Sequence, residues 1–392
     1  MQELHNFNLL ILDDGAVYPG TAFGAAAPEL DQLEPGSEPE KGAGEVVFNT
    51  AMSGYHEVLT DPSYTGQLVA MTYPHIGNYG TSADWSEVGP EGGCTRTAVK
   101  PAGFIVRGLY TGPVPGGRGT LHELLAAHAT PGIAGVDTRR LTLQLRDRGS
   151  RNGVILSAPN RAVGEIEKGE LERVTAFLRA FPPMEGRNLI DAVGTREPLS
   201  INAGGSPHLA LLDCGLKANI VRELTGRGAA VTVLPSTAPF EQLRETGARA
   251  LFLSNGPGDP AVLEQQVALV RRAIGRMPVL GICLGHQLIA EALGARTFKM
   301  KFGHHGINHP VRDEFTGKVF VTSQNHGFAV DERSIPKDAQ VWFRNANDGT
   351  NEGLVDRGRR VLSAQFHPES APGPVDSAWI FEEFLTAVRE GA

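Results

Sequence analysis

The sequence predicts an α/β protein with an N-terminal α+β domain and a second domain built on a mainly parallel sheet flanked by helices. From His208 onward, short apolar runs alternate with helical patterns, which is typical of parallel strands linked by helices. Before about residue 157, short β-type runs mix with two helical patterns, which favours an α+β domain. Hydrophobic residues make up 41% of the 392 residues, enough for more than one core.

The predicted elements follow one another in a clear order. In the N-terminal part, β-type runs cover residues 9–12, 45–49, 68–73, 104–107 and 153–156, and helical patterns cover 120–128 and 138–148. Residues 158–206 are charged and rich in proline and glycine, so we expect a connection that carries a helix. Strands are then predicted at 209–212, 230–234 and 250–253, with helices between them. We therefore expect domains at 1–157 and 207–392, joined by the segment 158–206.

Composition and charge limit the classes of function. The net charge of -8 argues against a nucleic-acid surface. No apolar stretch approaches the roughly 20 residues that span a bilayer, and the N-terminus does not resemble a signal peptide. Cys94, Cys214 and Cys283 are far apart without a C-x-x-C pair, which fits reduced thiols. We therefore expect a cytoplasmic enzyme.

The segment Gly281-Ile282-Cys283-Leu284-Gly285-His286-Gln287 is the most informative motif. An apolar run enters it and a helical pattern leaves it, so Cys283 is predicted at a strand-to-helix turn. Glycines permit the tight turn, and the helix N-terminus favours a thiolate and offers N–H groups to an oxyanion. A lone cysteine in an apolar run is more often a small core side chain. The flanking glycines and a downstream histidine favour a nucleophile here.

A histidine and a carboxylate end another apolar run, at Phe366-His367-Pro368-Glu369. In extended backbone His367 and Glu369 project to the same side, and Pro368 helps to hold that conformation. The residues Cys283, His367 and Glu369 can therefore form a catalytic relay. Taken separately, His367 can be a core histidine and Glu369 an exposed charge at a strand end.

Gly256 and Gly258 lie at another strand-to-helix change, between Leu253 and Pro260. Glycine lets a backbone N–H approach a substrate oxygen, because no Cβ stands in the way. The N–H groups of Gly256 and Leu284 are predicted to form an oxyanion hole, although glycines in such runs more often serve only as turn residues.

Motifs over nearly the whole chain resemble a known family. S-N-G-P-G-D-P at 254–260, G-I-C-L-G-H-Q at 281–287, Q-N-H-G-F at 324–328 and F-H-P-E at 366–369 resemble a class I glutamine amidotransferase domain. G-E-V-V-F-N-T at 44–50, L-T-D-P-S-Y at 59–64, T-Y-P-H-I-G-N at 72–78 and K-F-G-H-H-G at 301–306 resemble the small-subunit family of carbamoyl phosphate synthetase.

This resemblance implies a C-terminal class I glutaminase domain that hydrolyses glutamine through a Cys-His-Glu triad and a glutamyl thioester. It further implies that ammonia passes to a large ATP-dependent subunit, which makes carbamoyl phosphate from bicarbonate for arginine or pyrimidine synthesis. No cofactor is expected in this chain, whereas ATP and Mg²⁺ are expected on the large partner subunit. The sequence itself shows no P-loop motif.

Two other functions are the alternatives. One is a free-standing hydrolase of γ-glutamyl compounds that uses the same elbow, and the other is a regulatory subunit with an inactive glutaminase. The intact Cys283, His367 and Glu369 argue against the second.

Family similarity adds five contacts to the substrate glutamine, namely Ser63, Gln287, Asn325, Gly327 and Phe328. By its own sequence context, Ser63 is an ordinary turn residue. Since Ser63 belongs to the N-terminal domain, the resemblance implies that the two domains meet at the active site.

Three histidines raise the question of a metal site. His304, His305 and His309 have no thiol or carboxylate cluster beside them in the sequence, and adjacent residues in an extended chain point apart. We therefore expect no metal site.

Residues 28–41 form an acidic, proline-rich insertion before G-E-V-V-F-N-T. It has little apolar surface to bury, so we expect a disordered loop.

Overall fold

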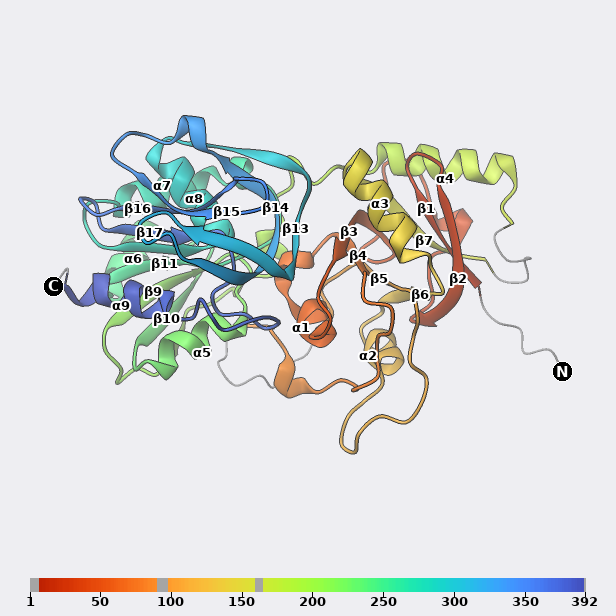
Figure 1. The fold of residues 1–392 in the computed structure, drawn as a ribbon, viewed down its shortest axis with the longest axis horizontal. Helices are drawn as coiled ribbons and strands as arrows, with labels where there is room; N and C mark the ends of the chain where they lie inside the picture. The colour runs from red at the N-terminus through yellow and green to blue at the C-terminus, as the bar shows by residue number, and fades with distance from the viewer. Residues whose placement is uncertain (1–6, 90–97, 159–164, 391–392) are drawn as a thin grey trace. The chain divides into compact units, whose positions relative to one another are not determined.

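The computed structural model describes residues 7–89, 98–158 and 165–390, and the chain forms two compact units (Figure 1). The first unit comprises Met1–Ser86 and Thr97–Glu185, and the second comprises Glu87–Arg96 and Gly186–Ala392. Cys94 lies outside the described residues. The domain limits expected at 157 and 206 stay a prediction.

The strands of the first unit close into a barrel in the order β1-β2-β6-β5-β4-β3-β7. Antiparallel pairing of β1 with β7 closes the barrel, whereas β3, β4, β5 and β6 pair in parallel along their run. The strand bounds are β1 Phe7–Leu12, β2 Val17–Gly24, β3 Ala43–Asn49, β4 Gln67–Met71, β5 Gly103–Val106, β6 Pro131–Ala134 and β7 Arg151–Ser157.

Side chains that alternate along the strands supply two cores in this unit. Leu10 and Leu12 of β1 pack in one cluster with helix α3 (Thr138–Arg148), while Leu9 and Ile11 pack in another with helix α4 (Lys168–Ala180). Helices α1 (Tyr55–Thr60) and α2 (Leu121–Ala127) complete the described part of the unit. The α4 helix, expected in a connecting segment, thus packs on the barrel.

The acidic insertion also packs on this unit, so the prediction of disorder missed an anchor. Residues Leu30–Gln32 form a short 3-10 turn, and Leu33 is only 5% exposed in the cluster beneath α4. Nζ of Lys41 donates to the carbonyl oxygens of Val99 and Pro101 at 2.9 and 2.8 Å. The buried Leu33 and the hydrogen bonds of Lys41 thus attach a segment that is otherwise polar.

The second unit is built on a sheet with the strand order β14-β13-β15-β16-β17-β12-β11-β9-β10-β8. The central run from β17 through β12, β11 and β9 to β10 is parallel, and the remaining pairs are antiparallel. The strand bounds are β8 Leu199–Ile201, β9 His208–Asp213, β10 Ala230–Pro235, β11 Ala250–Leu253, β12 Val279–Ile282, β13 Arg296–Asp313, β14 Val319–Asp331, β15 Gln340–Asn345, β16 Asn351–Asp356 and β17 Val361–Ala364.

Helices cover both faces of the parallel part of this sheet. Leu209 and Leu211 of β9 face the cluster that contains α5 (Ala218–Gly226) and α9 (Ile380–Glu390). Ala210 and Leu212 face the cluster of α6 (Phe240–Glu245), α7 (Glu264–Ala273) and α8 (Leu284–Leu293), and Figure 1 shows α7 and α8 on the opposite side of the sheet from α5. The predicted α/β class is confirmed. None of the described helices is long and apolar enough to cross a membrane.

Candidate active site

Cys283 lies where the central strand β12 gives way to helix α8. Its backbone has φ 55° and ψ -107°, a conformation that is strained in any residue other than glycine. Gly285 permits the turn, because a Cβ on it would lie 2.3 Å from the carbonyl oxygen of Leu253. The thiol is buried and donates to the carbonyl oxygen of Asn325 at 3.5 Å. The chain therefore has a strand-to-helix elbow that presents sulfur.

His367 and Glu369 follow β17, the strand beside β12. The N–H of Cys283 donates to the carbonyl oxygen of Ala364 at 2.8 Å, which ties the two segments together. His367 Nδ1 donates to Glu369 Oε1 at 2.5 Å, so Nε2 is the ring atom left to exchange a proton. Burial by itself lowers the pKa of His367, but the Glu369 carboxylate, with a smaller contribution from the neighbouring Cys283, outweighs burial and raises the pKa to about 10. A protonated imidazole beside a thiol stabilises the thiolate.

Lys217 is a residue of this site that the sequence analysis missed. Its Nζ is buried, 3.1 Å from Oε1 of Glu369 and 2.5 Å from the carbonyl oxygen of Ser370. Burial raises the pKa of Glu369, but the charges of Lys217 and His367 lower it to about 2, so the carboxylate stays ionised. The available signal was the position of Lys217 shortly after β9, at the same edge of the sheet as the elbow.

Gly256 and Leu284 stand on the two segments from which an oxyanion hole was predicted. Leu284 is the first residue of α8, so its N–H has no acceptor within the helix. A Cβ on Gly256 would lie 1.9 Å from the carbonyl oxygen of Cys214, which leaves room for glycine alone. Gly258 has φ 97°, and a Cβ there would lie 2.6 Å from the carbonyl oxygen of Arg187. Both glycines are therefore required by the backbone, whatever their role toward a substrate.

The predicted glutamine contacts of the second unit lie on two elements. Asn325, Gly327 and Phe328 belong to β14, and Gln287 belongs to α8. Nε2 of Gln287 donates to the carbonyl oxygen of Phe328 at 2.9 Å and to Oε1 of Gln365 at 3.0 Å. Its two donors are thus used, and Oε1 is the atom that it can offer to a ligand. Since the carbonyl of Asn325 accepts from the Cys283 thiol, these contacts connect β14, α8 and the elbow.

Ser63 lies in the first unit, in the 3-10 turn Pro62–Tyr64. Its N–H donates to Oδ1 of Asp61 at 2.9 Å, and the residue is 9% exposed. The contact of Ser63 with glutamine stays a prediction.

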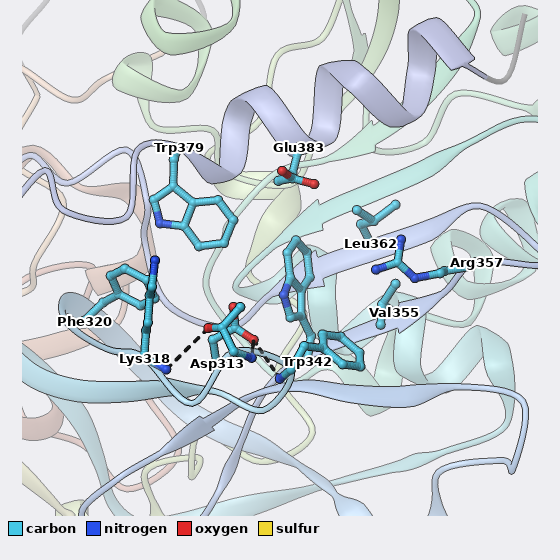
Figure 2. A pocket seen from close by; sticks show the side chains of 11 residues that line it. Asp313, Lys318, Phe320, Trp342, Val355, Arg357, Leu362, Trp379 and Glu383 are labelled. Carbon is cyan, nitrogen blue, oxygen red and sulfur yellow. Dashed lines mark hydrogen bonds between the residues drawn. The ribbon is translucent and has the colours of Figure 1, made fainter.

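A pocket of about 390 Å³ lies elsewhere in the second unit (Figure 2). The aromatic rings of Phe320, Trp342 and Trp379 and the charged side chains of Lys318 and Arg357 are among its lining. None of the predicted site residues lines this pocket, so it is separate from the Cys283 site.

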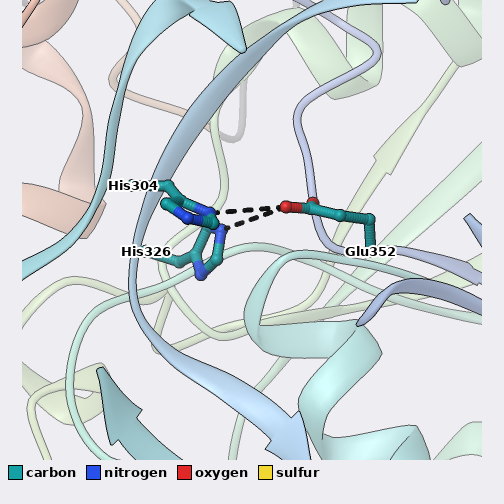
Figure 3. A group of neighbouring side chains, drawn as sticks. All are labelled: His304, His326 and Glu352. Carbon is teal, nitrogen blue, oxygen red and sulfur yellow. Dashed lines mark ion pairs between the residues drawn. The ribbon is translucent and has the colours of Figure 1, made fainter. Parts of the chain in front are cut away.

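Among the described residues, one group of side chains has the composition and spacing of a metal site: His304, His326 and Glu352, whose ligand atoms lie within 4.8 Å of one another (Figure 3). Other contacts already engage the two histidine side chains. His304 Nε2 lies 2.9 Å from Oδ2 of Asp348, and His326 Nε2 lies 3.0 Å from Oε1 of Gln324. The expectation that this chain has no metal site stays a prediction.

Comparisons with known proteins agree with the motifs. The family model described as "Carbamoyl-phosphate synthase small chain, CPSase domain" matches residues 10–155, and "Glutamine amidotransferase class-I" matches residues 210–387. The "Carbamoyl phosphate synthase small chain" of Archaeoglobus fulgidus is 42% identical over 382 residues, which cover 97% of this chain and 98% of the relative. Proteins with the same description from Nitratidesulfovibrio vulgaris and Methanopyrus kandleri are each 43% identical, cover 97% of this chain, and are themselves covered to 98% and 99%.

The chain belongs to the carbamoyl phosphate synthase small chain family. It is accordingly a glutamine-hydrolysing amidotransferase subunit. The resemblance stated from the motifs is confirmed, and the amidotransferase match covers the elbow, the loop after β11 and the histidine after β17. Membership of a synthase small-chain family implies a large-chain partner and glutamine as the substrate.

Proposed function

We propose that Cys283, His367 and Glu369 hydrolyse glutamine as a triad, and that the ammonia serves a large ATP-dependent subunit in the synthesis of carbamoyl phosphate. One observation carries this proposal: the strained Cys283 elbow ends β12 directly beside β17, after which His367 is held by Glu369. Nucleophile, base and orienting carboxylate thus come from neighbouring strand ends of one sheet.

The first half of the reaction forms a thioester. The Cys283 thiolate attacks the side-chain amide carbon of glutamine and forms a C–S bond. The N–H groups of Gly256 and Leu284 stabilise the oxyanion of the tetrahedral intermediate. His367 gives its Nε2 proton to the departing nitrogen as the C–N bond breaks, so ammonia leaves and a glutamyl thioester remains.

The second half regenerates the enzyme. His367, now neutral, takes a proton from water, and the resulting hydroxide attacks the thioester carbon. The C–S bond breaks, and glutamate and the thiolate are released. Glu369 keeps the imidazole in the tautomer with Nδ1 protonated, and Lys217 keeps Glu369 ionised. Both residues therefore serve the base rather than the substrate.

The remaining partners of the reaction belong to the proposal as well. Ser63, Gln287, Asn325, Gly327 and Phe328 hold the non-reacting end of glutamine. ATP and Mg²⁺ act on the large subunit, and the product enters arginine or pyrimidine synthesis. The described cysteines, Cys214 and Cys283, are free thiols, which supports work in the reducing cytoplasm.

The test uses the assembled complex with its large chain. Cys283→Ser is expected to abolish synthesis from glutamine and to retain synthesis from added ammonia, and Cys214→Ala is the control, since Cys214 is a second buried thiol. Mass spectrometry should detect a glutamyl adduct on Cys283 in the wild type. Loss of both activities in an assembled complex would contradict the assigned role. Rapid glutamine hydrolysis by the small chain alone would favour the free-standing hydrolase.

A further inference from the structure

Glu352 is a buried carboxylate that joins four neighbouring strands behind the predicted glutamine contacts. It lies on β16 and is 0% exposed. Oε2 accepts from Nε2 of Gln324 on β14 at 2.9 Å, and Oε1 accepts from Nδ2 of Asn345 on β15 at 3.0 Å. Nδ1 of His304 on β13 lies 3.4 Å from Oε1, and Nε2 of His326 on β14 lies 4.0 Å from it (Figure 3).

Each ring nitrogen of His326 faces a hydrogen-bond acceptor, and a neutral imidazole has only one N–H to donate. Its Nδ1 lies 2.8 Å from the carbonyl oxygen of Phe328, and its Nε2 lies 3.0 Å from Oε1 of Gln324. Both partners are oxygens that only accept hydrogen bonds. A neutral ring carries one N–H, so one ring nitrogen would direct its lone pair at an oxygen within hydrogen-bond distance. Two ring protons satisfy both contacts.

The amide of Gln324 allows one alternative, and that alternative holds the same number of protons. If the amide is turned round, its Nε2 donates to a neutral His326, and its Oε1 faces Oε2 of Glu352. That contact requires a protonated Glu352 to donate. In either arrangement the three side chains contain one proton more than a neutral histidine and an ionised glutamate. The orientation of the Gln324 amide decides only whether His326 or Glu352 carries this extra proton.

We propose that His326, Gln324 and Glu352 form a buried relay that holds one shared proton, and that this proton keeps β14 in the geometry that binds glutamine. The proposal deepens the proposed function and rests on it. The carbonyl oxygen of Phe328 accepts from His326 Nδ1 and also from Nε2 of Gln287. Loss of the proton would release either this carbonyl or Gln324, and the segment that carries Asn325, Gly327 and Phe328 would lose a fixed position.

Burial and the positive charge of His304 oppose the shared proton and make it sensitive to pH. Together they lower the pKa of His326 to about 3, although the Glu352 carboxylate and the hydrogen bond to the carbonyl oxygen of Phe328 act to raise it. The hydrogen bonds oppose this shift, because a buried acceptor that faces a lone pair has no solvent to replace its donor. The groups that face the relay are Lys299, His304, His305 and His309 on β13, Asp348 after β15 and Glu352 on β16.

Kinetics of the assembled complex test the proposal through KM. In the wild type, KM for glutamine should rise about tenfold for each pH unit above the point at which the relay loses its proton. Glu352→Gln should remove this rise of KM with pH. An amide at position 352 can donate to a turned Gln324, whose own amide then donates to a neutral His326, so no extra proton is needed. The control is Glu264→Gln, which changes an exposed glutamate at the start of α7. Rates with ammonia should not change in any variant.

Two results would overturn the relay. The first is an unchanged pH dependence of KM in a folded Glu352→Gln complex. The second comes from nuclear magnetic resonance of ¹⁵N-labelled histidine and ¹³C-labelled glutamate, with His326→Asn used for assignment. A neutral His326 together with an ionised Glu352 at neutral pH would exclude the shared proton. A wild type without any glutamine hydrolysis would instead defeat the proposed function, and the resonance experiment would still decide the relay.

Metal analysis separates the proton from a cation at the same place. If the purified complex contained one zinc ion per chain, and its removal by a chelator raised KM for glutamine, a metal would hold His304, His326 and Glu352 together. That outcome would replace the shared proton. We expect no stoichiometric metal and no effect of the chelator on KM.

Discussion

Replacement of Lys217 by methionine is expected to destabilise the second unit and to weaken the proposed triad. The substitution keeps an unbranched side chain but removes the charge that lies 3.1 Å from Glu369. Glu87 loses a compensating charge too, because Lys217 offsets part of the burial that raises the pKa of Glu87 to about 7. Both carboxylates are buried, with exposed fractions of 2% for Glu369 and 1% for Glu87. Neither can turn to water for a new partner.

The magnitude follows from the cost of an uncompensated buried charge. Removing one partner of a buried ion pair destabilises by roughly 3–5 kcal/mol. For a domain of this size, about 2–4 °C of Tm corresponds to each kcal/mol, so the unfolding temperature of the second unit should fall by roughly 6–20 °C. Protonation of Glu87 limits the loss near neutral pH, since its pKa should rise further in the variant.

The effect should depend on pH with a defined sign. The folded state lowers the pKa of Glu369 from 4.5 to about 2. Its contribution to stability is therefore complete above about pH 4.5 and is lost as the pH falls toward 2. Since Lys217 is the main favourable partner of this carboxylate, the difference in stability between the wild type and Lys217→Met should be largest above pH 4.5 and should shrink below it.

Unfolding by urea or heat at several pH values measures the stability difference, and steady-state kinetics with glutamine measures the triad. Lys337→Met is the matched control, because Lys337 is exposed in the same unit. Lys217→Met should also lower kcat for glutamine and leave the rate with ammonia unchanged. A loss of stability below about 0.5 kcal/mol at neutral pH, the size of an ordinary surface substitution, would refute the reasoning.

Three further substitutions test other parts of the chain. Gly256→Ala should lower kcat for glutamine by up to about 10²–10³, because the added Cβ would lie 1.9 Å from the carbonyl oxygen of Cys214 and so displace the loop that carries the Gly256 N–H, and an unaffected kcat in steady-state kinetics would remove this loop from the site. Ser63→Ala should raise KM for glutamine by about threefold to tenfold, as expected for one neutral hydrogen bond, with unchanged use of ammonia. Leu33→Ala should destabilise the first unit by roughly 2–5 kcal/mol in urea unfolding, whereas a disordered insertion would show no change.

Local patterns were sufficient where a feature depends on neighbours in sequence. The helical pattern at 138–148 coincides with α3 (Thr138–Arg148), because its apolar spacing reports the buried face of the helix. The elbow at Cys283 was readable from its flanking glycines and from the change of pattern between strand and helix. Leu33 was missed, since one apolar residue in an acidic segment has no periodicity.

Buried charges were not predictable from the same patterns. Lys217 contacts Glu369 only because β9 and β17 end at the same edge of the sheet. Glu352 meets Gln324 although β13 and β15 lie between β14 and β16 in the order of the sheet. Periodicity reports whether a side chain is buried, but it does not report which distant segment lies opposite to it.

By itself, the sequence determined the class of the fold and the strand-to-helix elbow at Cys283, and it predicted a base and a carboxylate at His367 and Glu369. These features depend on side-chain spacing within a few residues, which sets backbone geometry directly. The tertiary structure alone decided that β1 pairs with β7 to close a barrel, that β17 lies beside β12, and that Lys217 and Glu352 compensate charges far along the chain. Strand order and buried ion pairs depend on which distant surfaces exclude water together, and no local pattern contains that information.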